Sequence, residues 1–353
     1  MSYHSGTQNI SSNDHKYVID RKLLSVHSED RDVSKWPNSN NFEILVPDPL
    51  HNVQSMRLIQ SSFPTQMYLF SEYNQNIKFN ITTGGNKYTI TIRDGNYTKT
   101  TIATEIMYLL NNLGINDASF NVFFNNPQSR LYIGSNLQFT INAIDDILYN
   151  NCPENPVFKN YANWGLPYNL GFDKNNYIST QLTDAGEIFD LTYNSIYDIS
   201  NGSILQYVKA PFQLNLHGDT CIYMEVDKYN SYDELYAYGK SNPDKNKTPG
   251  GNNQTFVPVN NAYLGKTESA FAKIPIDRKN EYMYDSRTLN LCNIVHYDPP
   301  LERVTRMRFK FRYHDGRLVD FTNMPFDFTI EFNMLRNEFS KNLCVRIPST
   351  YLI

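Results

Sequence analysis

Residues 306–334 read RMRFKFRYHDGRLVDFTNMPFDFTIEFNM, and they carry the strongest structural signal in the chain. Apolar and polar residues alternate on both sides of a polar turn. The apolar positions are Met307, Phe309, Phe311 and Tyr313, then Phe326, Phe328, Ile330, Phe332 and Met334. A period of two is the pattern of a β-strand with one buried face. Because Asp315-Gly316 is a hairpin dipeptide, the sequence predicts an antiparallel meander with an apolar inner face.

The other face of the first run is basic. It carries Arg306, Arg308, Lys310 and Arg312. Four cations in a row repel one another, so we expect acidic neighbours, with Asp327 and Glu331 as candidates on the same sheet. Docking of an acidic partner protein is a second interpretation. Nucleic acid is the least favoured, because aromatic residues do not interleave on this face.

The first 64 residues divide into an arm and two strands. Residues 1–41 hold few large apolar side chains, so we expect an extended arm that gains order from a neighbour and whose residues 1–35 are dispensable for folding. Its candidate partner-binding residues are Asp30, Arg31, Asp32 and Trp36. Strands are expected at 42–46 and 53–59, separated by a corner at two prolines, and again at 76–82.

Residues 86–175 have a different pattern, which indicates a small α+β module. A helix is expected at 98–112 from apolar residues spaced by 3.6, and Gly114 is placed to end it. The expected strands are 88–92, 118–124, 130–134 and 137–141, with a short helix at 145–149.

Strand patterns return after the module. We expect strands at 188–191, 204–208, 221–226, 271–276 and 291–296, and a long polar loop at 239–262. The predicted fold is therefore mainly β, with the second half of the body at 186–353 continuing the sheet begun at 42–85.

Bulk composition sets the class of protein. A chain of 353 residues can bury a core without disulfides or metals. A net charge of −4 provides no global attraction to nucleic acid. The four cysteines are widely spaced and form no CxxC pair, so we expect thiols in a reducing compartment. The first residues lack the apolar segment of a signal peptide, and no apolar run is long enough for a transmembrane helix.

Catalytic motifs are missing from the sequence, which contains no GxGxxG, GxxxxGK[ST], GxSxG or HExxH. Glu225 and Asp227 share a strand face and could act as paired acids, although a solvated face explains them more simply. Three His/Asp neighbours could seed a metal site, but turns are the better interpretation: His217/Asp219, His296/Asp298 and His314/Asp315. We expect no enzyme activity, no cofactor and no metal.

Four segments in this order carry a resemblance to a known family. They are residues 29–64 (EDRDVSKWPNSNNFEILVPDPLHNVQSMRLIQSSFP), 91–111 leading to NLGF at 169–172, FAKIPID at 271–277, and 299–332. Together they resemble the minor capsid and related virion proteins of the nucleocytoplasmic large DNA viruses, the giant viruses. The resemblance spans roughly 29–335.

The resemblance implies a structural protein without catalytic residues. The implied fold is a jelly-roll-like antiparallel β-sandwich (42–85 and 186–353) with the inserted α+β module (86–175) and the N-terminal arm (1–41). The implied role is a minor capsid component, penton-like or cementing, that stabilises an icosahedral shell.

Its implied partners are the major capsid protein, other minor capsid proteins and, by self-association, further copies of itself, with no specific nucleic acid. It would be found in the virion, after assembly in the host cytoplasm. Two alternatives remain open: a host-attachment or fibre-base protein that binds glycans, and a glycan-active enzyme on a jelly-roll scaffold.

Overall fold

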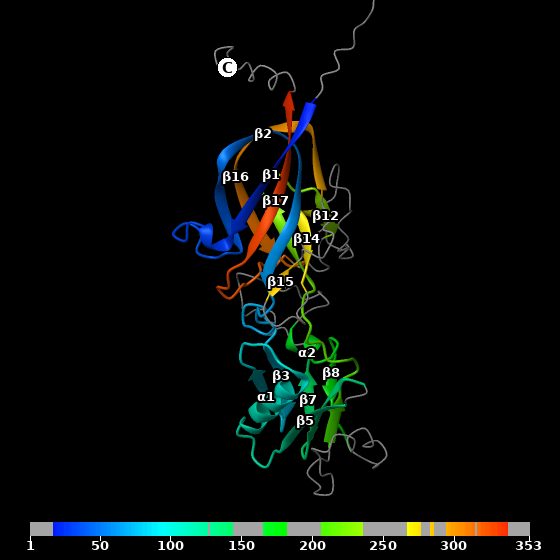
Figure 1. The fold of residues 1–353 in the computed structure, drawn as a ribbon. Helices are drawn as coiled ribbons and strands as arrows, with labels where there is room; N and C mark the ends of the chain where they lie inside the picture. Colours follow the sequence, from blue (N-terminus) through cyan, green and yellow to red (C-terminus); the bar gives the residue numbers. More distant parts are fainter. Residues whose placement is uncertain are drawn as a thin grey trace, which may run out of the picture.

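The computed structural model describes residues 17–125, 128–143, 165–181, 206–235, 267–276, 283–285, 294–314 and 316–337. Two lobes stand end to end (Figure 1). The upper lobe contains both ends of the described chain, and the lower lobe is built from its middle. Each lobe encloses its own cluster of buried apolar residues.

The upper lobe is one antiparallel sheet of seven strands. Its order is β1-β17-β2-β16-β11-β14, and β15 pairs with the end of β2. The strands are β1 (Tyr17–His27), β2 (Asn41–Pro64), β11 (Cys221–Val226), β14 (Ala272–Pro275), β15 (Met283–Asp285), β16 (Ile294–Arg312) and β17 (Asp327–Asn337). A separate two-stranded sheet joins β12 (Tyr232–Leu235) to β13 (Thr267–Ala270), and the short 3-10 helix η1 covers Ser28–Asp30.

Strand β2 lies between the two C-terminal strands. It pairs with β16 from Asn41 to Arg57 and with β17 from Val53 to Ser62, with register shifts in both ladders. This pairing joins the two halves of the body that the sequence predicted to share one sheet. In the predicted meander, the return of the chain after the turn is present as an isolated antiparallel bridge between Arg312 and Leu318. The run at 326–334 does not lie beside 306–313, however, because β2 is inserted between them. The two predicted strands also merge into one, because β2 bends through its prolines without ending.

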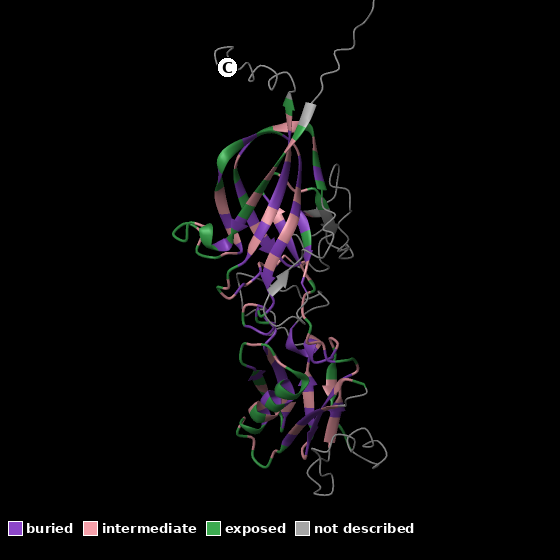
Figure 2. Ribbon diagram, in the orientation of Figure 1, coloured by how far each residue is buried: buried purple, intermediate pink, exposed green. Residues whose placement is uncertain are grey.

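The core of the upper lobe is aromatic. Phe42, Phe309, Phe311, Phe326 and Phe328 are at most 2% exposed, and their ring centroids lie 4.9–6.5 Å apart. Figure 2 shows buried residues alternating with intermediate and exposed ones along the long strands. The predicted apolar inner face is thus confirmed, and so is the fold class: mainly β, with antiparallel sheets in a sandwich-like body.

The N-terminal segment is not a free arm. Residues 17–27 form β1, which pairs with β17 over its whole length, from Tyr17↔Asn337 to His27↔Asp327. Leu24 packs against the core and Val26 is buried in it. The sequence prediction failed here because β1 mixes charged and apolar residues without clear alternation. Removal of residues 1–35 would delete an edge strand, so we expect it to destabilise the upper lobe.

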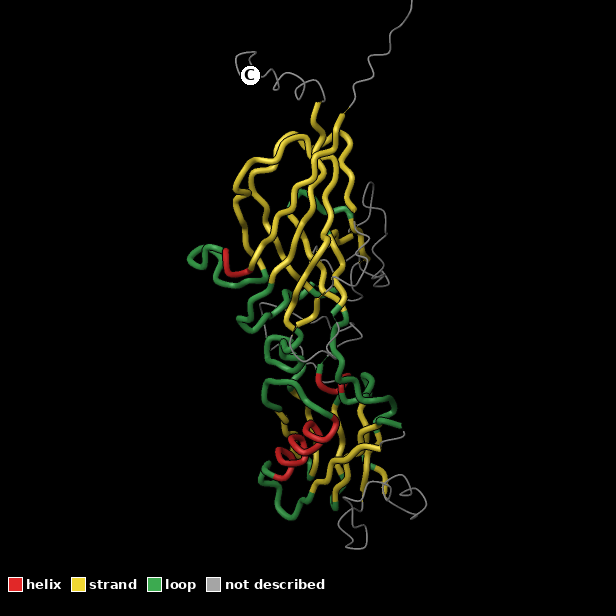
Figure 3. The backbone as a smooth tube through the Cα atoms, viewed as in Figure 1, coloured by secondary structure: helices red, strands yellow, loops and turns green. Residues whose placement is uncertain are grey.

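In its described residues, the lower lobe holds two four-stranded antiparallel sheets and two helices (Figure 3). One sheet is β4 (Asn86–Thr91), β3 (Lys78–Thr83), β7 (Phe139–Asn142) and β8 (Asn176–Ile178). The other is β5 (Phe120–Asn125), β6 (Arg130–Ser135), β10 (Gln206–Lys209) and β9 (Thr180–Gln181). The two helices are α1 (Lys99–Asn111) and α2 (Leu166–Asn169).

Helix α1 confirms the helix predicted at 98–112. Thr98 is its N-cap and exchanges reciprocal hydrogen bonds with Thr101, which satisfies two backbone donors of the first turn. Ile102, Ile106 and Leu110 are at most 1% exposed and form its buried face. The hairpin predicted from 118–124 and 130–134 is confirmed as β5 and β6.

The lower lobe is larger than the predicted module. Strand β3 pairs with β4 and β7, and β10 pairs with β6 and β9. Both strands were expected in the main body, and their alternation gives no sign of which sheet they join. The second core reaches from Leu69 to Leu216, so we propose this wider extent for the insertion. The expected helix at 145–149, the strand at 188–191 and the loop at 239–262 lie outside the described residues.

Gly171, in the NLGF segment, fixes the chain returning from the lower lobe. Its carbonyl accepts a hydrogen bond from Phe212 N (3.0 Å), and Asn169 exchanges two with Asn215 (2.8 and 3.0 Å). Gly171 has φ +89°, and a Cβ there would lie 2.4 Å from the Phe212 carbonyl oxygen. Only glycine fits this close approach.

We therefore predict that Gly171→Ala destabilises the protein by roughly 2 kcal/mol or more, from backbone strain and a backbone clash. The matched control is Gly85→Ala, which has a similar φ of +80° with nothing within 4 Å. Urea unfolding of both variants separates the clash from the φ penalty. Equal losses would show that the approach of the 212–215 segment does not matter.

Candidate protein-protein interface

The basic residues of β16 find acids on both neighbouring strands. Arg306 lies 3.8 Å from Glu43 on β2, Lys310 lies 3.1 Å from Glu225 on β11, and Arg312 also pairs with Glu225. The expectation of cross-strand acids is correct, but the expected acids are wrong. Asp327 and Glu331 belong to β17, which β2 separates from β16.

The acids lie deeper than the cations. Side-chain exposure is 70% for Arg306 and 41% for Lys310, against 30% for Glu43 and 20% for Glu225. Arg312 is the exception, because it is 1% exposed and lies 5.2 Å from the ring centroid of Tyr223. Of the four predicted cations, Arg306, Arg308 and Lys310 thus reach solvent, and Arg312 is a buried structural residue.

Trp36 joins this face from the loop between η1 and β2. The Arg308 guanidinium lies 4.9 Å from its ring centroid, and Arg308 Nε donates to Asn41 Oδ1 at 3.1 Å. A stacked guanidinium of this kind contributes about 0.5–1 kcal/mol at an exposed site. The structure therefore unites two groups that the sequence predicted separately, the arm residue Trp36 and the basic strand.

Arg31 and Asp32 give the loop its shape. Arg31 donates to three carbonyls, those of Ser28 (2.6 Å), Trp36 (3.1 Å) and Pro37 (3.2 Å). Asp32 accepts from Ser34, and this hydrogen bond holds the pKa of the Asp32 carboxyl below its ordinary value. Asp30 ends η1 and is exposed. Arg31 and Asp32 thus position Trp36, and their charges are occupied within the loop.

We define the docking face as Trp36, Glu43, Leu45, Arg306, Arg308 and Lys310. Leu45 is directly opposite Arg306 in the ladder and is 75% exposed. Neither Leu45 nor Glu43 was among the predicted site residues. The signal was present in the alternation of 42–46, which places both on the face opposite Phe42. The arrangement is an exposed leucine and a tryptophan surrounded by outward-facing cations.

Glu331 serves a different purpose, at the N-terminal edge of the sheet. It lies 2.5 Å from Arg21 on β1 and 2.8 Å from Arg57 on β2, with its side chain only 4% exposed. Burial raises the pKa of Glu331, but hydrogen bonding from Arg57 and the charges of Arg57 and Arg21 outweigh it, so the pKa is lowered overall. This ladder of three charges joins β1, β17 and β2.

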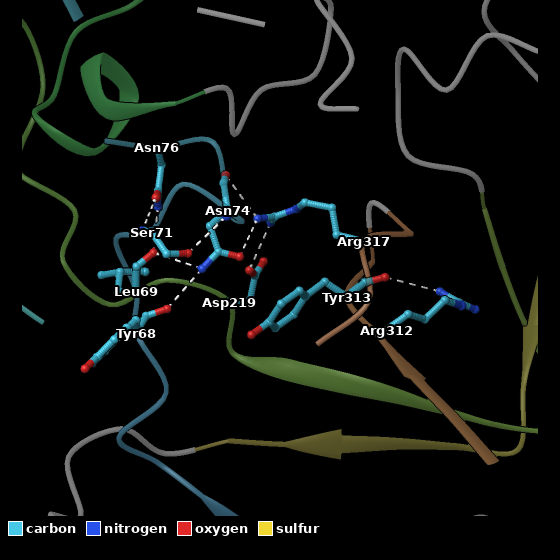
Figure 4. A network of polar contacts seen from close by, with 9 residues as sticks. All are labelled: Tyr68, Leu69, Ser71, Asn74, Asn76, Asp219, Arg312, Tyr313 and Arg317. Carbon is cyan, nitrogen blue, oxygen red and sulfur yellow. Dashed lines mark hydrogen bonds and ion pairs between the residues drawn. The ribbon is translucent and has the colours of Figure 1, made fainter. Parts of the chain in front are cut away.

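A polar junction connects the two lobes (Figure 4). Arg317, in the turn after β16, is 8% exposed and donates to Asn74 Oδ1 (3.1 Å), Asn74 O (3.4 Å) and Asp219 Oδ2 (3.3 Å). Its guanidinium also lies 5.3 Å from the Tyr313 ring centroid. Asn74 lies on the segment that leads from the upper lobe into the lower lobe, and Asp219 lies on the segment that returns. The Arg317 side chain therefore hydrogen-bonds to both connecting segments.

Side-chain amides hold the first connection in place. Asn74 Nδ2 donates to the carbonyls of Tyr68 (3.0 Å) and Leu69 (3.2 Å), and Asn76 Nδ2 donates to Leu69 O (2.7 Å). Ser71 N donates to Asn76 Oδ1 at 3.0 Å. Because Ser71, Asn74 and Asn76 are at most 9% exposed, these bonds are shielded from water and fix the backbone of the segment.

Two of the residues weighed for chemistry are used in structural contacts. Glu225 is held by Lys310 and Arg312, and Asp219 is held by Arg317. Among the described residues, no three His, Cys, Asp or Glu side chains are grouped as a metal site would require. None of the helices in the described ranges is long and apolar enough to cross a membrane.

Residues 14–240 match the family described as "Family of unknown function (DUF5901)". This match covers more than half of the chain. The chain belongs to this family. The match includes β1, β2 and the described strands and helices of the lower lobe. No curated protein matches the sequence.

Two solved structures illustrate the similarity to known folds. The mavirus penton protein is 10% identical with a TM-score of 0.39, and the match covers 90% of this chain and 99% of that one. A chain in the cryo-EM structure of the Sputnik virophage is 9% identical with a TM-score of 0.35, covering 90% and 98%. Both TM-scores are below 0.5, so we base the functional proposal on the chain's own residues.

The charge ladder predicts how stability depends on pH. Since the folded-state pKa of Glu331 is lowered, its contribution is complete above the ordinary pKa of a glutamate and is lost as the pH falls through the folded value. We expect Glu331→Gln to cost roughly 2 kcal/mol at neutral pH, because Arg57 and Arg21 lose their shared partner. The loss relative to wild type should shrink on acidification.

The matched control is Asp48→Asn, which removes the exposed ion pair between Asp48 and Lys22. We expect less than about 1 kcal/mol from it. Urea unfolding at a series of pH values measures both variants. A loss at Glu331→Gln that stays constant with pH would contradict the assigned charge interaction.

The junction predicts a role for Arg317 in holding the lobes together. We expect Arg317→Ala and Arg317→Lys both to loosen the arrangement, because lysine keeps the charge but cannot bridge two acceptors with a planar fork. The readouts are faster proteolysis within 65–77 and 214–220 and a larger radius of gyration by small-angle scattering.

The exposed Arg303 on β16 provides the matched control, as Arg303→Ala. It should leave both readouts unchanged. If Arg317→Lys behaves like wild type, charge alone holds the junction, and the hydrogen-bond geometry described above is not required.

Proposed function

We propose that this chain is a structural protein of a virus particle, and that it binds other capsid proteins through the docking face. The observation that carries the proposal is the composition of that face: exposed Leu45 and half-buried Trp36 among outward-facing cations, over acids that lie deeper. Apolar and aromatic anchors with an arginine-rich surround are typical of protein interfaces. The sequence resemblance to virion proteins supports the same assignment.

The exposed residues of the docking face indicate which chemical groups its partner must present. Arg306, Arg308 and Lys310 favour an acidic surface, and Leu45 requires an apolar pocket within it. A single-sign patch speeds association and makes it sensitive to salt. We propose the major capsid protein or another minor capsid protein as the partner, which gives this chain a penton-like or cementing role in a giant-virus shell. Assembly would take place in the host cytoplasm.

Proteomics of purified virions tests whether the chain is a component of the particle at all. Particles purified to homogeneity should contain the chain at a fixed ratio to the major capsid protein. If infected cells contain the chain while purified particles lack it, the structural role is wrong.

A charge-reversal variant tests the docking face. We expect Arg306→Glu/Arg308→Glu to weaken incorporation into particles by about tenfold or more, because attraction to an acidic partner becomes repulsion. Lys87→Glu, a reversal at an exposed position on the lower lobe, is the matched control and should be incorporated normally. Equal incorporation of both variants would exclude this face as the contact.

A further inference from the structure

We propose that the free edge of β1 pairs with β1 of a second copy, antiparallel, to form a dimer whose sheet continues across a two-fold axis. This surface is distinct from the docking face, which lies on β2 and β16. The proposal does not depend on the partner assigned to that face.

The edge itself is suited to strand addition. Among the described residues, β1 is the last strand in the sheet order, and β17 pairs with all eleven of its residues along one edge. Its sequence YVIDRKLLSVH contains neither proline nor glycine. The strand at the other end of the order, β14, has four residues and ends at Pro275. Long edges without proline are templates for pairing with another chain.

The outer face of β1 carries exposed aliphatic side chains. Ile19 is 61% exposed and Leu23 is 51% exposed. They are four residues apart, with Arg21 midway. In an antiparallel pairing centred on Arg21, Ile19 of each copy lies opposite Leu23 of the other. A two-fold interface repeats every contact, so the Ile19–Leu23 pair forms twice.

The charged residues on the inner face of β1 favour the same pairing, centred on Arg21. Asp20 and Lys22 flank Arg21, so the pairing places Asp20 of each copy opposite Lys22 of the other. Within one copy, Asp20 is 2.6 Å from Arg336 and Lys22 is 3.4 Å from Asp48, so both charges enter the interface partly neutralised. Opposite charges across strands stabilise an antiparallel pair.

The neighbouring registers are disfavoured. A centre at residue 20 would place Asp20 opposite Asp20, and a centre at residue 22 would place Lys22 opposite Lys22. The cost of the chosen centre is that the two Arg21 side chains meet on the axis. Glu331 of the same copy lies 2.5 Å from each of them, which offsets the repulsion. Charge complementarity therefore favours a second copy over an unrelated strand.

The test is sedimentation velocity of the full chain over a concentration series. We expect a reversible dimer for the wild type. Asp20→Lys and Lys22→Asp should each raise the dissociation constant by about tenfold or more, since each places like charges opposite one another twice. An equimolar mixture of the two variants should dimerise, because in the mixed dimer both facing pairs of residues 20 and 22 then have opposite charge.

The mixture separates the proposal from a folding defect, because two misfolded variants would not rescue each other. Leu45→Lys, on the docking face, is the matched control and should dimerise like the wild type. A monomeric wild type at all concentrations overturns the proposal. So does a wild-type dimer that both single variants retain, since that dimer would use another surface.

Discussion

Strand β2 hydrogen-bonds to both β16 and β17, and the upper lobe depends on this shared position. The partners of Phe42 and Met56 are Phe309 and Phe332, more than 260 residues further along the chain. Closing contacts over such distances costs conformational entropy that only a large buried surface can offset. The phenylalanine cluster supplies this buried surface, and each fully buried ring contributes roughly 1.5–3 kcal/mol of hydrophobic stabilisation. The lower lobe is inserted inside this closure.

Alternation along the same strands produces the surfaces. Once Phe309 and Phe311 point inward, Arg308 and Lys310 must point outward, so the core and the docking face are consequences of one pattern. The charges on the outer face then depend on which strands are neighbours. Glu225 serves β16 because β11 pairs with it, whereas Glu331 serves β1 and β2 because β17 lies between them.

This division also explains what the sequence could predict. Local patterns identified β5 and β6, helix α1, and the inner face of β16, because each depends on spacing within a few residues. Neighbours could not be predicted, because alternation states which face is buried and not which strand lies beside it. For this reason Glu331 was assigned to the wrong cations and β3 to the wrong lobe. The edge strand β1 was missed because only one of its faces packs, and two of its charges, Asp20 and Arg21, are balanced by Arg336 and Glu331, more than 300 positions away.

The junction between the lobes follows another physical rule. Among the described residues, its hydrogen bonds join Arg317 to Asn74 and Asp219. Apolar surfaces tolerate sliding, because dispersion and hydrophobic burial have little directional preference. Hydrogen bonds from a planar guanidinium to two acceptors require particular directions. The hydrogen bonds of Arg317 to both connecting segments therefore favour one relative placement of the two lobes. With the docking face on the upper lobe bound as proposed, this junction would hold the lower lobe at a defined angle to that partner.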